Sequence, residues 1–338
     1  MSNPISRCIL LYSGGLDSIL AYKILQAQQI DVIALKLVTP FFENEGRNKK
    51  NRPWEEIARQ YDIKYITKDI SEEFINIVRS PKYGYGKHLN PCIDCKIFMV
   101  KKALETLEEY NADFVATGEV VGQRPMSQRR DTMRIIERDS GAEGIILRPL
   151  SALRLKPTLV EEKGLVDRSK LLGISGRGRK DQMSLANSLG IHEYPAPAGG
   201  CILADPILSK RIRQLITMYP DITPVEIKVA QTGRMFFLPD NAWLVIGRNK
   251  ADNTRIKELA PQGALLLSAF GIPSPTGILL RCRQEDRQQI IKAAQLLVRY
   301  CSRAKMDLLD SALIPVGIFS NEGVLLDQIK TTYNHETD

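Results

Sequence analysis

CILLYSGGLDS, residues 8–18, decides the fold of the first half of this 338-residue chain. An apolar run over residues 8–12 stops at a Ser-Gly-Gly turn, and from Asp17 onward apolar positions recur at helical spacing. The pattern predicts a buried strand, a tight turn and a helix. Two glycines in such a turn let successive backbone N–H groups point at one anion, and the helix N-terminus adds positive potential. We therefore call residues 13–18 the phosphate turn.

The phosphate turn also carries side chains suited to a magnesium nucleotide. Ser13 and Ser18 offer hydroxyl donors, and Asp17 offers a carboxylate of the kind that holds Mg²⁺. A Walker-type P-loop is excluded because no lysine followed by Ser or Thr closes the turn. The alternative is an incidental glycine turn in which Asp17 only caps the helix.

The series Ser-Gly-Gly-x-Asp-Ser after a first strand resembles the hallmark of the PP-loop ATP pyrophosphatases. In that family ATP is split between its α and β phosphates, and the substrate is adenylated. The resemblance implies a catalytic part for Asp17. It also implies that the β and γ phosphates and Mg²⁺ are bound by Ser13, Gly14, Gly15, Asp17 and Ser18.

Strand and helix patterns alternate along the rest of the first half of the chain. This alternation predicts an α/β fold, a parallel sheet with helices on both faces. The expected strands are 30–38, 64–68 and 113–117, and the expected helices are 54–61, 70–79 and 93–110.

Two prolines, Pro220 and Pro224, interrupt the helical pattern that follows residue 206. We accordingly expect a PP-loop domain over residues 1–222 and a second domain over 223–338. The second domain mixes short strands with a helix near 284–304, so we expect a smaller α+β domain.

Two further stretches are similar to the Thr-Gly-Glu, Gly-Gln, Ser-Gln and Arg-Pro-Leu series of tRNA 4-thiouridine synthetases. They are ATGEVVGQRPMSQ (116–128) and ILRPL (146–150). The resemblance covers about the first 210 residues and implies that Gly118, Gln123 and Ser127 lie beside the nucleotide.

The chain departs from that family in a three-residue insertion at 124–126 and in showing neither its amino-terminal RNA-binding modules nor its rhodanese extension. We therefore expect RNA and sulfur to be delivered differently.

Three cysteines are candidates for sulfur chemistry. Cys92-Ile93-Asp94-Cys95 opens a helix, and Cys201 follows a glycine-rich turn at 198–200. A helix N-terminus lowers the pKa of a thiol, so we expect thiolates. Three thiolates can hold a [4Fe–4S] cluster whose open iron carries hydrosulfide, and the arrangement resembles the cluster-dependent tRNA thiolases of the superfamily.

Two alternatives stay open for these cysteines. In the first, no cluster is present, and Cys92 or Cys201 would carry a persulfide that is resolved by formation of a disulfide. In the second, the three thiols would bind structural Zn²⁺ together with a nearby ligand such as His88. The other cysteines, Cys8, Cys282 and Cys301, lie in apolar stretches, where a buried inert thiol is expected.

Basic residues predict a polyanionic partner. The formal net charge is +8, and the isoelectric point is near 9.1. In the glycine- and arginine-rich segment 118–181 we expect RNA contacts from Arg177, Arg179 and Lys180.

A stretch that begins at Ala242, AWLVIGRNKADNTRIKELAPQG, is similar to the RNA-binding domain of NFACT proteins, matching its Gly-Arg-Asn and downstream Asn253. From this stretch we expect phosphate contacts by Arg248, Lys250 and Arg255. The alternative is a charged, solvated face.

The combined prediction is a cytoplasmic tRNA sulfurtransferase that adenylates a uridine carbonyl and then displaces AMP with sulfur, yielding 4-thiouridine. Sulfide or a cysteine desulfurase would supply the sulfur. No membrane span or export signal is expected. The alternatives are sulfuration or amidation of a small molecule and a non-catalytic, nucleotide-sensing RNA-binding factor. Whether two copies form a homodimer is left open.

Overall fold

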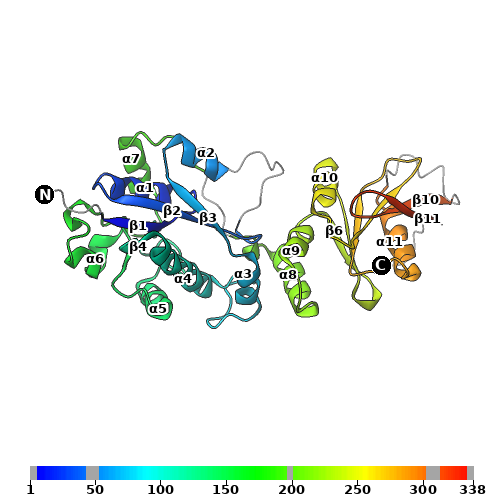
Figure 1. Ribbon diagram of the computed structural model, residues 1–338, viewed down its shortest axis with the longest axis horizontal. Helices are drawn as coiled ribbons and strands as arrows, with labels where there is room; N and C mark the ends of the chain where they lie inside the picture. Colours follow the sequence, from blue (N-terminus) through cyan, green and yellow to red (C-terminus); the bar gives the residue numbers. More distant parts are fainter. Residues whose placement is uncertain (1–5, 43–52, 196–200, 302–312, 333–338) are drawn as a thin grey trace. The chain divides into compact units, whose positions relative to one another are not determined.

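The computed structural model describes residues 6–42, 53–195, 201–301 and 313–332. The chain divides into two compact units, Met1–Ser209 and Lys210–Asp338 (Figure 1). The division falls within helix α8 (Pro206–Met218), ahead of both prolines that motivate our boundary. The domain ends at 222 and 223 stay a prediction.

The first unit alternates strands and helices, as its sequence predicts. Its strands are β1 (Arg7–Leu11), β2 (Asp31–Val38), β3 (Tyr65–Asp69), β4 (Phe114–Thr117) and β5 (Ile146–Leu147). Its helices are α1 (Leu16–Gln26), α2 (Pro53–Gln60), α3 (Ser71–Arg79), α4 (Cys92–Tyr110), α5 (Arg130–Ser140), α6 (Leu159–Glu162) and α7 (Lys180–Ser188).

The five strands form one parallel sheet in the order β3-β2-β1-β4-β5. The strand order reverses direction between β1 and β4, which are hydrogen-bonded neighbours. In open α/β sheets ligands bind beyond the carboxyl ends of the strands at such a switch point. The phosphate turn follows β1 and residues 118–128 follow β4, so both lie at this edge.

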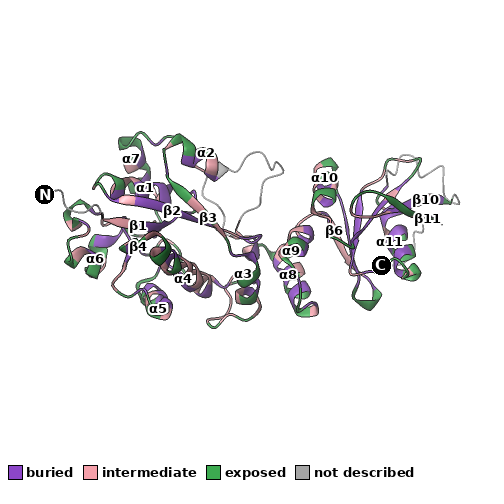
Figure 2. Ribbon diagram, viewed as in Figure 1, coloured by how far each residue is buried: buried purple, intermediate pink, exposed green. Residues whose placement is uncertain are grey.

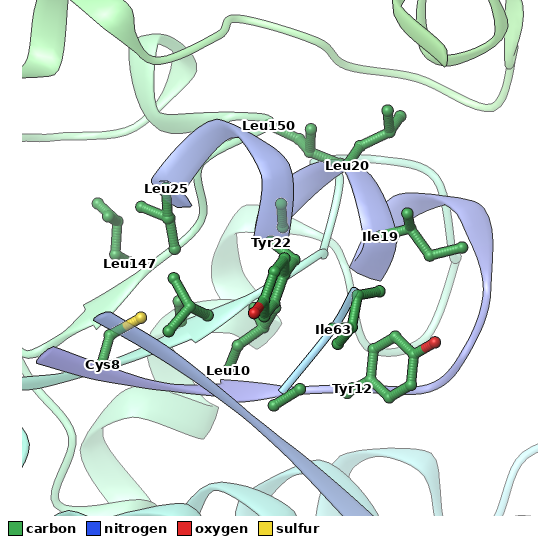
Figure 3. Packing of buried hydrophobic residues seen from close by; sticks show 14 of the residues in the cluster. Cys8, Leu10, Tyr12, Ile19, Leu20, Tyr22, Leu25, Ile63, Leu147 and Leu150 are labelled. Atoms are coloured by element: carbon green, nitrogen blue, oxygen red, sulfur yellow. The ribbon is translucent and has the colours of Figure 1, made fainter. Parts of the chain in front are cut away.

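Helices cover both faces of the parallel sheet, which confirms the predicted fold class (Figure 1). Alternate residues of β1, Cys8 and Leu10, pack with α1 residues such as Leu20 and Leu25 in one buried cluster (Figure 3). Helix α4 contacts β1 and β4. The central strands are buried along their length (Figure 2), which explains why they read as continuous apolar runs.

The second unit is an α+β domain, as predicted. Its helices are α8, α9 (Pro224–Ala230), α10 (Lys250–Leu259) and α11 (Arg287–Val298). Its strands are β6 (Arg234–Phe237), β7 (Trp243–Ile246), β8 (Leu265–Ala269), β9 (Gly277–Leu280), β10 (Ile314–Phe319) and β11 (Leu325–Thr331).

These six strands form an antiparallel sheet in the order β11-β10-β8-β9-β7-β6. Helix α11 packs on the sheet, where Ile290 and Leu297 join the buried side chains of Leu244, Leu267 and Val316. Over the described ranges, no helix in either unit has the length and apolar character needed to cross a membrane.

Candidate active site

The phosphate turn has a backbone that only glycine adopts easily. Gly14 has a φ of +82°, and a Cβ there would lie 2.5 Å from the Cβ of Trp54 in α2. Helix α1 begins after Gly15 without a side-chain cap among the described residues. The alternative in which Asp17 only caps this helix is therefore wrong. Amide groups at the start of the helix remain available to an anion.

Two serines brace the turn from within. The Ser18 hydroxyl donates to the Gly15 carbonyl at 2.7 Å, and the Gly15 N–H donates to Ser13 Oγ at 3.2 Å. The two hydroxyl oxygens lie 3.2 Å apart. The structure thus brings together the residues that the sequence assigns to the phosphates.

Lys36 is a residue of this site that sequence reasoning missed. Its ammonium group, carried by the buried strand β2, donates to the Ser13 carbonyl at 3.1 Å and lies 5.2 Å from the ring centroid of Trp54. The side chain is 4% exposed. The sequence did contain a signal for this residue, a lysine inside the apolar run 30–38. A lysine in a buried strand is rare unless it has a partner, so its position indicates a specific role.

The segment after β4, residues 118–128, packs directly against the phosphate turn, and we call it the 118–128 loop. A Cβ at Gly118 would lie 2.5 Å from the Asp17 carbonyl oxygen. The Gln123 side-chain amide donates to Asp17 Oδ2 at 3.1 Å, and contacts of Gly118 and Gln123 with a nucleotide stay predictions. Ser127 is buried in the same loop, and its contact with a nucleotide stays a prediction.

Asp17 lies in a partly desolvated, positively charged setting. Burial raises the pKa of its carboxyl, although the Gln123 hydrogen bond and the nearby charges of Arg179 and Arg124 oppose this. The charge of Arg179, for which we expect an RNA contact, therefore reaches the Asp17 carboxyl. Arg177 and Lys180, its neighbours in sequence, are exposed.

A buried ion cluster fixes the 118–128 loop to the cysteine-bearing helix. Glu119 accepts from Arg148 Nε at 3.2 Å and pairs with Lys96 Nζ at 3.6 Å, while Arg148 also pairs with Glu137. Burial alone would raise the pKa of the Glu119 carboxyl, but Lys96 and Arg148 outweigh it and the pKa is lowered. Lys96 follows Cys95 in α4, so one carboxylate links the two halves of the site.

Cys92 and Cys95 occupy the first turn of α4, as predicted. The Asp94 carboxylate between them accepts the backbone N–H groups of Lys82 and Tyr83 at 2.9 and 3.0 Å. The Asn90 side-chain amide donates to Cys92 Sγ at 3.2 Å. These bonds fix the segment that leads into the helix.

Cys201 approaches the same region from a distant part of the chain. It precedes a short 3₁₀ turn, Ile202–Ala204, and the carbonyl of Leu203 accepts the N–H of Leu89 at 3.1 Å. The turn expected at 198–200 lies outside the described residues.

The three thiols lie within electrostatic reach of one another. Burial raises the pKa of Cys95 to about 12, with Cys201 and Cys92 adding to the effect, and burial also raises the pKa of Cys201. The expectation of free thiolates is therefore wrong for Cys95 and Cys201, because desolvation outweighs the helix N-terminus.

No three His, Cys, Asp or Glu side chains in the described part of the chain, His88 included, are already arranged to hold a metal ion. The donor chemistry nonetheless suits an iron–sulfur cluster, which is ligated by cysteine thiolates.

In the second unit, the Gly-Arg-Asn motif is largely structural. A Cβ at Gly247 would lie 2.0 Å from Asn253 Oδ1, and that oxygen accepts the Thr276 N–H at 3.0 Å. The Asn249 side chain caps α10 by accepting the Asp252 N–H at 3.0 Å. The motif therefore joins α10 to the sheet.

The three basic residues expected to bind RNA have different surroundings. Arg248 Nε pairs with the Asp252 carboxylate at 2.7 Å, although the arginine side chain is 48% exposed. Arg255 pairs with Glu258 at 3.6 Å. Lys250, the first residue of α10, is exposed. Their contact with RNA stays a prediction.

Residues 6–141 match the family described as "tRNA methyl transferase HUP domain". This match covers the parallel sheet up to β4, the phosphate turn and the whole 118–128 loop. The amino-terminal part of the chain is a HUP domain with a PP-loop. Residues 233–313 match the family described as "NFACT protein RNA binding domain", and the carboxy-terminal unit contains this domain.

Several curated relatives are similar to part of the chain at modest identity. Argininosuccinate synthase from Methylobacillus flagellatus is 31% identical over 122 residues, 34% of this chain and 29% of that protein. A probable tRNA sulfurtransferase from Thermococcus kodakarensis is 24% identical over 172 residues, 49% and 41% of the two chains. The tRNA-specific 2-thiouridylase MnmA from Cytophaga hutchinsonii is 28% identical over 136 residues, 36% and 37%. The chain thus spans less than half the length of these relatives.

The solved structures similar to the chain include two enzymes that act on RNA. A 4-thiouridine synthetase–RNA complex with bound ATP shares 20% identity at a TM-score of 0.34, over 67% of this chain and 54% of that one. The U34-tRNA thiolase NcsA from Methanococcus maripaludis, with its [4Fe-4S] cluster, shares 18% identity at a TM-score of 0.31, over 67% and 71%.

We expect the substitution Gly118→Ala to damage the site through the contact with α1. The added methyl group has no room against the Asp17 backbone, so the free energy of unfolding should fall by about 1–3 kcal/mol and the affinity for magnesium ATP should fall with it. Urea denaturation and calorimetric titration measure the two effects. Gly178→Ala is the matched control, because its Cβ would meet open space. Equal stability of the two variants would contradict the close approach.

We expect Arg148→Met to destabilise the first unit by about 3 kcal/mol at neutral pH, because the buried Glu119 carboxylate loses its Arg148 partner and keeps only Lys96, at 3.6 Å. The difference from the unsubstituted chain should shrink as the pH falls. Because folding lowers the pKa of Glu119, its charged form stabilises the unsubstituted protein above the ordinary pKa of a glutamate, and this stabilisation is lost as the pH falls through the lowered pKa. In the variant, protonation of Glu119 removes the poorly compensated buried charge. Arg138→Met, at a solvent-screened pair with Asp139, is the control and should destabilise the protein far less. A pH-independent difference in urea denaturation would be evidence against the cluster.

Proposed function

We propose that the chain is an ATP-dependent tRNA uridine thiolating enzyme whose product is 4-thiouridine. One observation carries the proposal: within a single HUP domain, the 118–128 loop touches the phosphate turn through Gly118 and the cysteine helix through Glu119 and Lys96. Helix α4 runs back to the start of β4, so its first turn belongs to the same carboxyl edge of the sheet as the phosphate turn. The arrangement suits a reaction that needs ATP cleavage next to sulfur.

The first step in this proposal activates the base. A uridine leaves its stack to reach the site, as the bases modified by other enzymes do. Its carbonyl oxygen attacks the α-phosphorus of ATP, the bond to the β-phosphate oxygen breaks, and pyrophosphate leaves. The turn amides and the hydroxyls of Ser13 and Ser18 hold the pyrophosphate, and Asp17 would hold Mg²⁺.

The second step replaces oxygen with sulfur. Hydrosulfide adds to the activated ring carbon and AMP leaves with the former carbonyl oxygen, so one ATP gives AMP and pyrophosphate and no electron is transferred. A [4Fe–4S] cluster held by Cys92, Cys95 and Cys201 would supply iron with an open coordination position for sulfide. The surrounding bonds from Asp94 and Asn90 orient the first turn of α4. Sulfide or a cysteine desulfurase is the donor in this proposal.

Transfer RNA is the proposed substrate. The NFACT-type domain, the tRNA sulfurtransferase and thiouridylase relatives, and the basic character of the chain support this choice. Exposed Arg177, Lys180, Arg248 and Lys250 are suited to phosphate contacts, which position an RNA without reading its sequence.

Anaerobic incubation of the cluster-reconstituted protein with tRNA, magnesium ATP and sulfide tests the proposal. Mass analysis of the digested nucleosides should show a uridine with one oxygen replaced by sulfur, at the retention time of 4-thiouridine. Cys92→Ser, Cys95→Ser and Cys201→Ser should each reduce the product to background. Cys282→Ser and Cys301→Ser, at buried thiols in the second unit, are matched controls that should retain activity.

Two results would count against the proposal. Absence of any thiouridine from a preparation that binds both ATP and tRNA would exclude uridine thiolation. Release of pyrophosphate with a small carboxylic or carbonyl substrate, and none with tRNA, would favour the chemistry of the argininosuccinate synthase relative instead.

A further inference from the structure

Buried polar atoms without partners gather beside Asp17. Asp17 Oδ1, Gln123 Oε1, Arg179 Nε and both amide atoms of Gln182 make no well-formed hydrogen bond among the described residues, and the one weak bond at this place joins the Gln182 side chain to Asp17. The Gln182 side chain is fully buried, at 0% exposure. Folded proteins leave few buried polar groups unpaired, because each unpaired group costs the free energy of its lost hydration. Several such atoms at one place point to a ligand.

Three segments bring these atoms together. Gln123 in the 118–128 loop is bonded to Asp17 at the start of α1. The loop is joined to the segment before α7 by the bridge between Val121 and Ser175, where the Gly176 N–H donates to the Val121 carbonyl at 2.7 Å.

Helix α7 in turn contacts α1. Gln182 and Arg179 are three residues apart, on one side of the start of α7, and each lies close enough to lower the pKa of the Asp17 carboxyl.

The unpaired atoms divide into two chemical kinds. The oxygens of Asp17, Gln123 and Gln182 are acceptors of the kind that magnesium prefers. Arg179 Nε and the Gln182 side-chain nitrogen are donors suited to phosphate oxygens. A free anion would satisfy only the donors, and a free cation only the acceptors. A polyphosphate with its bound magnesium ion satisfies both.

We propose that Gln182 and Arg179 of α7 form a third wall of the nucleotide site and bind the magnesium-bound polyphosphate tail of ATP. The inference rests on the proposed function only for the identity of the nucleotide. It reassigns Arg179 from RNA to ATP, and it adds α7 to the phosphate turn and the 118–128 loop as an element that recognises the ligand.

Calorimetric titration of the full chain with magnesium ATP, magnesium pyrophosphate and AMP tests this assignment without tRNA or sulfur. Gln182→Leu should raise the Kd for magnesium ATP and magnesium pyrophosphate by roughly tenfold or more, because donor and acceptor are lost together. The Kd for AMP should not change. The melting temperature of the ligand-free variant should change little, since the removal of two poorly paired buried atoms offsets the loss of the weak bond to Asp17.

The matched control is Gln289→Leu, at a buried glutamine of the second unit whose Oε1 is also unpaired within the described ranges. It should bind magnesium ATP like the unsubstituted chain. If Gln182→Leu folds poorly, Arg179→Met serves as the second variant, with the same expected loss for both polyphosphates and none for AMP.

Unchanged magnesium ATP affinity in a folded Gln182→Leu or Arg179→Met variant would overturn the inference, and so would an equal loss of AMP binding. The thiolation proposal fails separately. A protein that makes no thiouridine but loses magnesium ATP affinity in both variants would leave this inference standing.

Discussion

The contact of Gly118 with the backbone of Asp17 and Ser18 is the interaction on which the site depends. It exists because β1 and β4 are neighbours in the sheet, so the segments that follow them leave the same edge side by side. Without a side chain at 118, the loop after β4 reaches the first turn of α1. This approach brings Gln123 to Asp17.

Buried ion pairs connect the 118–128 loop to the helix that carries Cys92 and Cys95. Glu119, next to Gly118, is held by Arg148 and by Lys96 of the cysteine helix, so the loop cannot move relative to α4 without separating buried charges. Such clusters are costly to form and are better at specifying one geometry than at adding stability. Here the geometry they specify is the spacing between an ATP-cleaving turn and a group of thiols, which is what a coupled adenylation and sulfur transfer requires.

Much of this followed from local sequence. The run at 8–18 predicted strand, turn and helix because burial and glycine conformations are local properties, and the alternation up to residue 117 predicted the parallel sheet. Tertiary packing places Lys36 against the phosphate turn and brings the charge of Arg179 to Asp17. The spacing of residues along the sequence does not reveal such packing. The thiolate expectation failed at Cys95 because burial, unreadable from a helix start, dominates its pKa. In the second unit, Pro315 and Gly317 obscure the strand pattern of β10, and β11 carries mostly exposed side chains, so neither reads as a buried strand.

An oxygen label tests the central claim, that the phosphate turn activates a uridine carbonyl by adenylation. Transfer RNA carrying ¹⁸O at the uridine carbonyl positions would be incubated with the enzyme, magnesium ATP and sulfide, and the AMP released would be weighed by mass spectrometry. The account predicts one ¹⁸O atom in the phosphate of AMP for each thiouridine formed. Unlabelled AMP, with the label recovered in water or retained in uridine, would contradict it.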